Sequence, residues 1–151
     1  MHEAPEQYPK RFDVCILQRV INHNKEPMIY ETIWGQPVSK ANSYIAVPDG
    51  EGGKRIIKNE RIRAYERSFD EQCKIYRNRW INHPFRLHIT VYESSNAYDL
   101  DNCLKTVLDC LQYVGAITND NLCVGILASK RIDRDHPRIE YAIEELEPTL
   151  F

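Results

Sequence analysis

The stretch YDLDNCLKTVLDCLQYVGAITNDNLCV, residues 98–124, decides how the rest of the chain is organised. Its apolar side chains recur every three or four positions, as on one face of an amphipathic helix. Asp101, Lys105 and Asp109 follow one another at four-residue spacing and form a polar stripe on the opposite side. We therefore expect a helix over residues 102–114, packed on the core by one face and charged along the other.

The two aspartates at the start of this helix, Asp99 and Asp101, have a structural and a chemical interpretation. Carboxylates cap free backbone N–H groups and complement the helix dipole, and most aspartates at such positions do nothing more. Two carboxylates spaced by one residue can also hold a hard divalent cation. Lys105, one turn later, could then reach a phosphate, and Asp120 could close the cluster from the turn after the helix. These residues leave both interpretations open.

One protein family has charged residues at this spacing. The tetrapeptide DLDN (residues 99–102), then Lys105 and Asp109 at four-residue steps, and a further acid after the helix, Asp120, resemble the motif of the RusA family of Holliday junction resolvases. The resemblance is fairly specific, because several positions have to fall in register. It implies a structure-selective DNA endonuclease that acts on branched DNA as a homodimer and resolves four-way junctions by paired nicking.

The same resemblance implies a role for each charged residue of the motif. Asp99, Asp101 and Asp120 would be ligands of Mg²⁺, with Mn²⁺ as the alternative ion, since clustered carboxylates are how proteins hold such cations. A bound ion activates water and neutralises developing charge in phosphodiester hydrolysis. Lys105 would contact the scissile phosphate or the leaving oxygen. For Asp109 we expect the more modest role of an ion-pair partner for Lys105.

The chain departs from the family pattern in three places. Residues 93–98 contain no arginine, whereas RusA-type proteins tend to have several directly before the motif; Asn119 replaces an acid beside Asp120; and residues 1–27 extend beyond the usual start. The first departure concerns DNA contacts more than the metal site. Two alternative functions follow, a catalytically silent nucleic-acid-binding protein of the same fold and an interaction module whose acids only cap a helix.

The position of Asp120 raises a question of reach. A helix over residues 102–114 takes the chain about 20 Å away from its start, at about 1.5 Å per residue. Residues 115–119 can return at most about 17 Å when fully extended. A site within one chain leaves almost no slack, so we expect a composite active site that uses Asp120 of the partner subunit.

Composition places the chain among ordinary globular proteins. It has 151 residues, 42% of them hydrophobic and 28% charged, which predicts one domain with a sizeable core. The net charge of −2 argues against a protein that coats nucleic acid indiscriminately. No apolar run has membrane-spanning length and no secretory signal is visible. Five cysteines without a Cys-x-x-Cys pair indicate reduced thiols, so we expect a cytoplasmic protein, with Cys103 and Cys110 as small core residues.

Outward from the motif, periodicity predicts the remaining elements. Strands are expected over residues 28–34, 84–92, 122–129 and 138–146, a hairpin from 43–47 and 55–57, and a helix over 59–79. In the last strand, Glu140, Glu144 and Glu145 are expected on the solvent side. This order predicts an α+β fold, a single domain with a mixed β-sheet covered by two main helices. We assign 1–27 to an N-terminal extension with a short strand at 12–20, 28–147 to the nuclease domain and 148–151 to a tail.

A basic segment precedes the motif. Residues 54–79 contain nine Lys or Arg and four Asp or Glu, which gives a local charge of +5 in a slightly acidic chain. One interpretation is a solvated helix with ion pairs such as Arg67 with Glu71. The other is a phosphate-facing surface. The predicted DNA-binding residues are Arg61, Arg63, Arg67, Lys74, Arg77 and, beyond the segment, Lys130.

Overall fold

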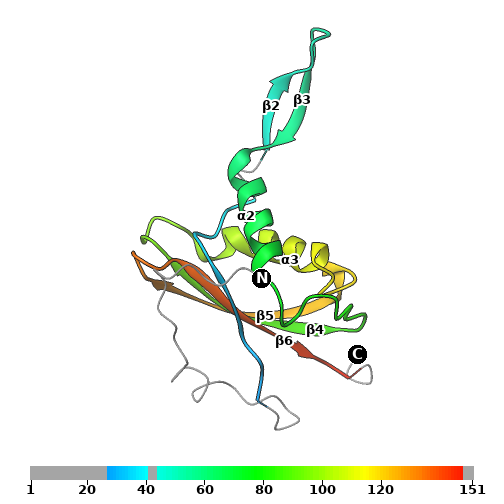
Figure 1. Cartoon of the computed structure of the whole chain (residues 1–151), viewed down its shortest axis with the longest axis vertical. Coiled ribbons are helices and arrows are strands. Elements are labelled where there is room, and N and C mark those ends of the chain that lie inside the picture. Colours follow the sequence, from blue (N-terminus) through cyan, green and yellow to red (C-terminus); the bar gives the residue numbers. More distant parts are fainter. Residues whose placement is uncertain (1–26, 41–43, 148–151) are drawn as a thin grey trace.

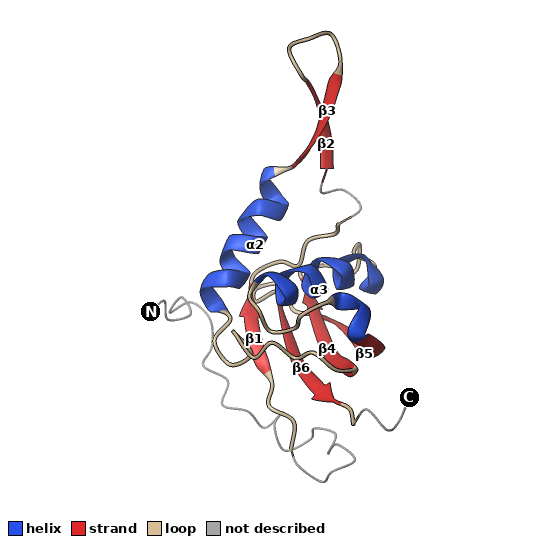
Figure 2. Ribbon diagram, turned by 90° about the vertical axis from the view of Figure 1, so that its right-hand side faces the viewer, coloured by secondary structure: helices blue, strands red, loops and turns tan. Residues whose placement is uncertain are grey.

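A four-stranded mixed sheet has the two main helices of the molecule on one of its faces (Figures 1 and 2). This computed structural model describes residues 27–40 and 44–147. In chain order the elements are β1 Glu31–Trp34, β2 Tyr44–Pro48, β3 Lys54–Lys58, α2 Glu60–Gln72, β4 Phe85–Glu93, the 3₁₀ turn η1 Leu100–Cys103, α3 Leu104–Tyr113, the 3₁₀ turn η2 Asp120–Leu122, β5 Cys123–Ile132 and β6 Arg138–Glu145. The strand order is β1-β6-β4-β5. The predicted α+β class, with a mixed sheet and two helices, is confirmed.

Strand β4 holds the sheet and the motif together. It pairs antiparallel with β6 on one side and parallel with β5 on the other. Parallel neighbours need a crossover connection, and α3 supplies it between β4 and β5. The apolar side chains that alternate along β4 are at most 3% exposed: Phe85, Leu87, Ile89 and Val91. The acidic motif therefore lies where a buried strand ends and the crossover helix begins.

Helix α2 is shorter than predicted. The helix expected over residues 59–79 starts with Asn59 as its N-cap, as expected, but ends at Gln72, after which the chain is extended. The next backbone N–H groups donate to the carboxylate of Glu31 on β1; they belong to Lys74, Ile75 and Tyr76. Because these groups bond to a strand instead of to helical carbonyls, the chain leaves the helix. The second half of this prediction is wrong.

The solvent-facing side expected of β6 is also wrong for two of its three glutamates. Glu140 and Glu144 are 7% and 6% exposed. Glu144 lies 2.8 Å from the His88 ring, and Glu140 accepts a hydrogen bond from the Tyr92 hydroxyl (3.2 Å). Strand β6 lies between β1 and β4, so polar side chains on its second face meet partners on the neighbouring strands.

Strands β2 and β3 form the predicted hairpin, separate from the main sheet and projecting away from the body of the molecule (Figures 1 and 2). We call residues 44–58 the β2–β3 ribbon. Its register runs from Tyr44 opposite Lys58 to Pro48 opposite Lys54. In the turn, the Asp49 carboxylate accepts hydrogen bonds from two backbone N–H groups at 2.8 and 2.9 Å.

Some sequence predictions concern other parts of the chain. The short strand expected at 12–20 lies outside the described residues, and the boundaries of the extension, domain and tail stay predictions. Cys103 and Cys110 are buried, and burial raises the pKa of each thiol to about 12, which fits their predicted role in the core. Neither of the long helices in the described ranges, α2 or α3, has the length and hydropathy of a membrane span.

Candidate active site

The motif helix begins without a side-chain cap. Asp99 precedes η1 with extended dihedral angles, yet its side chain makes no capping hydrogen bond and accepts one only from the Asn102 side chain, at 3.5 Å, among the described residues. Asp101 is exposed, and its carboxylate has no hydrogen bond or ion pair with any described residue. α3 then starts from Cys103, again with no side-chain cap. Helix capping therefore accounts for neither carboxylate.

Lys105, in the first turn of α3, lies between two carboxylates. Its ammonium group is 3.0 Å from Asp109 and also contacts Asp120, while Lys40, from the loop after β1, pairs with Asp109 as well. We call these four residues the lysine–carboxylate cluster. Hydrogen bonds with Asp120 and then Asp109 raise the pKa of Lys105. Burial acts to raise the pKa of Asp109, but the two ammonium groups outweigh it and leave that pKa lowered.

Asp120 reaches Lys105 of its own chain. α3 ends at Tyr113, and Gly115 takes a left-handed conformation (φ 74°) that turns the chain back. The backbone N–H of Asp120 then donates to the side-chain oxygen of Gln112 (3.1 Å). The chain thus doubles back far enough to bring Asp120 to Lys105, but in the described residues it does not group Asp120 with Asp99 and Asp101, so the composite site stays a prediction.

The three predicted metal ligands do not converge. Asp99 and Asp101 lie together at η1, whereas Lys105 engages Asp120. Within residues 27–40 and 44–147, no three His, Cys, Asp or Glu side chains are grouped so that they could hold a metal ion. Carboxylates suit a hard divalent cation. For all three carboxylates to bind one ion, Asp120 would have to leave its ion pair with Lys105 and bind the cation instead.

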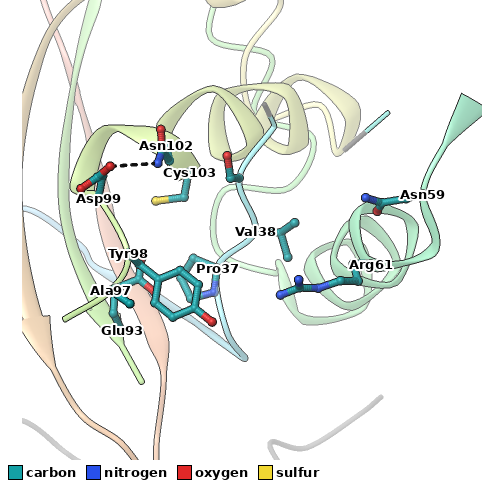
Figure 3. A pocket seen from close by; sticks show the side chains of 11 residues that line it. Pro37, Val38, Asn59, Arg61, Glu93, Ala97, Tyr98, Asp99, Asn102 and Cys103 are labelled. Atoms are coloured by element: carbon teal, nitrogen blue, oxygen red, sulfur yellow. Dashed lines mark hydrogen bonds between the residues drawn. The ribbon is translucent and has the colours of Figure 1, made fainter. Parts of the chain in front are cut away.

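A cavity of about 260 Å³ adjoins Asp99 (Figure 3). Residues 37–39 line one side, the motif a second, and the start of α2 a third, from which the Arg61 side chain points inward. Glu93, which also lines it, is only 2% exposed. Burial raises the pKa of Glu93, although Gln36 donates a hydrogen bond to it. The cavity thus places a cation and a buried carboxyl group beside a predicted metal ligand.

Some of the predicted DNA-binding side chains have no hydrogen bond or ion pair within the described part of the chain, and others already have one. Arg61 and Arg63 have no side-chain hydrogen bond or ion pair with any described residue. Arg67 instead pairs with Glu60 at 2.6 Å, and not with Glu71 as the solvated-helix interpretation proposed. Of the predicted DNA-binding residues on α2, the structure thus leaves the two in its first turn, Arg61 and Arg63, available.

Two of the other cations of that set, Arg77 and Lys130, hold parts of the fold together. Arg77 donates to the backbone carbonyl of Cys73 (2.9 Å) and pairs with Asp70 (2.7 Å), which closes the C-terminal end of α2. Lys130 donates to the backbone carbonyl of Tyr98 (2.9 Å) and so ties β5 to the motif. Lys74 is exposed just after α2.

Sequence reasoning missed Lys40 and Glu93. Lys40 lies in a loop whose composition is typical of turns, and nothing local indicates its partner on α3, 69 positions away. Glu93 did have a signal. It continues the two-residue alternation of the buried face of β4, so its carboxyl group could have been expected to point inward.

Comparison with known proteins matches this chain to one family of nucleases. A family model described as "Endodeoxyribonuclease RusA" matches residues 35–144. The crossover junction endodeoxyribonuclease RusA of Aquifex aeolicus (strain VF5) is 31% identical over 100 residues, which cover 65% of this chain and 76% of that protein.

The family match gives the class of protein, a nuclease, and the structure shows it as a mixed sheet with an acidic motif at the start of its crossover helix. Within that class, the chain belongs to the RusA family of endodeoxyribonucleases, because the family model spans well over half of its length.

Proposed function

We propose that this protein is a Mg²⁺-dependent endonuclease that resolves four-way DNA junctions by paired nicking. One observation carries the proposal: Asp99 and Asp101 present exposed, uncapped carboxylates one turn before Lys105, in a chain of the RusA family. The relative from Aquifex aeolicus is named as a crossover junction endodeoxyribonuclease, which supports branched DNA as the substrate.

Asp99, Asp101 and Asp120 would hold the ion, as Mg²⁺ or Mn²⁺. Bound there, the ion would supply an activated water and neutralise charge on the phosphate. The chain itself leaves the carboxylates of Asp99 and Asp101 without hydrogen bonds to the backbone of the helix. Both carboxylates are therefore exposed and available to an ion. Lys105 meanwhile neutralises Asp120 until a ligand competes for that carboxylate.

Lys105 is suited to act on the scissile phosphate. Its two carboxylate partners raise its pKa, so the side chain carries a positive charge at neutral pH. More than half of the side chain is exposed, and it lies one helical turn beyond Asp101. We propose that it leaves Asp120 to donate a hydrogen bond to the phosphate or the leaving oxygen, while Lys40 keeps Asp109 neutralised.

Paired nicking requires two sites related by symmetry, so we propose a homodimer. Strand β5 lies at the edge of the main sheet and exposes apolar side chains, namely Val124, Ile126 and Leu127 at 48%, 41% and 57%. Exposed edges of this kind are usually covered in native proteins. A second copy related by two-fold symmetry would cover this one.

A nicking assay on four-way junctions, with Mg²⁺ or with chelator, tests the proposal. We expect cleavage at symmetric positions with Mg²⁺ and none with chelator. Metal-independent binding without cleavage would instead support the catalytically silent DNA-binding protein. That alternative is favoured by one observation, the lack of convergence of the three carboxylates among the described residues.

Mixed dimers test whether each site comes from one chain. Because Asp120 contacts Lys105 of its own chain, we expect a heterodimer of Asp101→Asn and Asp120→Asn subunits to be inactive. A composite site would leave one intact set of carboxylates in such a heterodimer, which would then nick one strand. Single-strand nicking by a verified heterodimer would therefore contradict the one-chain site.

A further inference from the structure

The two strands of the β2–β3 ribbon contribute no buried residue to the core of the protein. All residues of both strands are exposed or half-buried, with Ile56 at 74% and Ile45 at 46%. A two-stranded hairpin is only marginally stable by itself in water. Exposed apolar side chains on such an element indicate a surface that binds something.

The base of the ribbon is tied to the two helices that flank the candidate active site. Lys58 pairs with Glu66 of α2 at 2.7 Å. Lys40 lies over the Tyr44 ring, 5.9 Å from its centre, and also pairs with Asp109 of α3. These contacts fix the direction in which the ribbon leaves the body, relative to Lys105 and the motif.

The register of the ribbon places the two cations of its outer half, Lys54 and Arg55, on opposite faces. Residues directly opposite each other share a face, and residues two apart on one strand share it too. Lys54, Ile56 and Lys58 therefore lie on the same face, with Arg55 on the other. Lys54 and Arg55 have no side-chain hydrogen bond or ion pair with any described residue. The outer half of the ribbon thus offers two available cations and an exposed isoleucine.

This pattern matches duplex DNA better than a second copy of the chain. The major groove is about 12 Å wide and admits a two-stranded ribbon, with phosphates at its rim and base edges inside. Available cations on both faces of the ribbon's outer half, Lys54 on one and Arg55 on the other, suit the two rims of such a groove. Two copies of the ribbon packed against each other would instead bring like charges together.

We propose that the β2–β3 ribbon binds the duplex arm next to the cleaved strand with the edge of β3 in the groove, so that Lys54 on one face and Arg55 on the other reach the two phosphate rims, with Ile56 inside the groove. This inference rests on the proposed function, since it takes branched DNA as the substrate. Strands of five residues span roughly 17 Å, which corresponds to about five base pairs of duplex. The contact should therefore depend on the length of the arm.

The test compares binding to junctions with arms of about 20 base pairs and with arms closed by a loop after about three, which is shorter than the span of the ribbon. Binding is measured in chelator, for the wild type and for Lys54→Ala/Arg55→Ala. On long arms the variant should bind about tenfold more weakly, and the slope of log affinity against log salt should fall by about 2. On short arms the two proteins should bind equally. The control Lys54→Arg/Arg55→Lys, which keeps both charges, should match the wild type throughout.

Each other outcome overturns the inference. An equal loss on both arm lengths would place these cations at the branch point, and no loss would remove them from the interface. Loss of the dimer in sedimentation would assign the ribbon to a second copy. Because binding is measured without cleavage, a protein that never nicks would refute the proposed function, and the comparison of arm lengths would still decide the role of the ribbon.

Discussion

Two kinds of carboxylate in this molecule have opposite surroundings. Glu31, on β1, is 5% exposed and accepts hydrogen bonds from three backbone N–H groups and from the Tyr141 hydroxyl (2.7 Å). Asp101, at the start of the motif helix, is exposed and has no partner among the described residues. The hydrogen-bonding capacity of the Glu31 carboxylate is used within the fold, whereas that of the Asp101 carboxylate is available to a ligand.

The difference follows from the cost of burial. A buried carboxylate is strongly destabilising unless its oxygens are hydrogen-bonded, so the donors around Glu31 are a condition of its burial. Water satisfies Asp101, and its charge costs the fold little. Substitution of Glu31 should therefore change the free energy of unfolding, and substitution of Asp101 should change the rate of cleavage.

The largest effect is expected from Asp101→Asn. We expect the cleavage rate to fall by about 10³-fold, because a neutral amide is a poor donor to a divalent cation. Junction affinity should stay the same or improve, since a negative charge near phosphates is removed. The measurements are single-turnover nicking and binding in chelator.

A matched control is available for that variant. Asp135→Asn removes the same charge from an exposed aspartate in the turn between β5 and β6, and should leave the nicking rate near that of the wild type. If Asp101→Asn also nicks at the wild-type rate, Asp101 is not a metal ligand. Its lack of partners would then not indicate a role in catalysis.

The next effect concerns stability. Glu31→Ala should lower the free energy of unfolding by roughly 3 kcal/mol, because several buried donors lose their acceptor together. Glu71→Ala, at an exposed position, should change it by less than about 0.5 kcal/mol. Urea titration measures both variants. A small loss for Glu31→Ala would mean that water replaces the carboxylate and that the chain after α2 does not depend on it.

The same contact explains what the sequence could and could not predict about the fold. The motif helix and the strands were predictable, because their apolar periods are local. The end of α2 was not predictable, because Cys73 and Tyr76 continue the helical spacing of buried residues. The group that ends the helix, Glu31, lies about forty positions earlier and meets it only in the folded chain.

The site shows the same division between local and distant information. The ion pair of Lys105 with Asp109 follows from four-residue spacing on a helix, and the structure confirms it. The contacts of Lys105 with Asp120 and of Lys40 with Asp109 depend on the return of the chain after α3 and on the loop after β1. Spacing alone does not fix these paths, so the position of Asp120 had to be judged from chain length, which favoured the partner subunit.

Lys105→Ala should have a smaller effect than Asp101→Asn. We expect turnover to fall roughly 100-fold through loss of a hydrogen-bond donor to the transition state. The melting temperature should change little, because the ion pairs of an exposed helix lysine add little stability. Nicking rates and thermal melts measure the two quantities. A large loss of stability with a proportionate loss of activity would make Lys105 a structural partner of Asp109 and Asp120, and would place it with Glu31 in the comparison.

The smallest effect extends the comparison from carboxylates to cations. The side chains of Arg61 and Arg63 make no hydrogen bond or ion pair with the described residues, nor does that of Asp101, while Arg67 is paired with Glu60. A cation that already has a partner must give it up to bind phosphate, so it releases less free energy on binding DNA. We therefore expect the contribution of α2 to affinity to come mainly from its first turn.

Arg61→Ala/Arg63→Ala should flatten the salt dependence of junction affinity by about 2 in the slope, since each lost phosphate contact removes about 0.9 counterions. The effect should appear on short and long arms alike, because Arg61 points into the cavity beside Asp99. Arg67→Ala should change the slope by well under 1, because its pairing with Glu60 already offsets its charge. Fluorescence anisotropy across a salt series measures all three proteins. Equal slopes for the double variant and the wild type would show that available charge on α2 does not mark a DNA contact. The inference that a charged side chain without a partner binds a ligand would then apply to the carboxylates only.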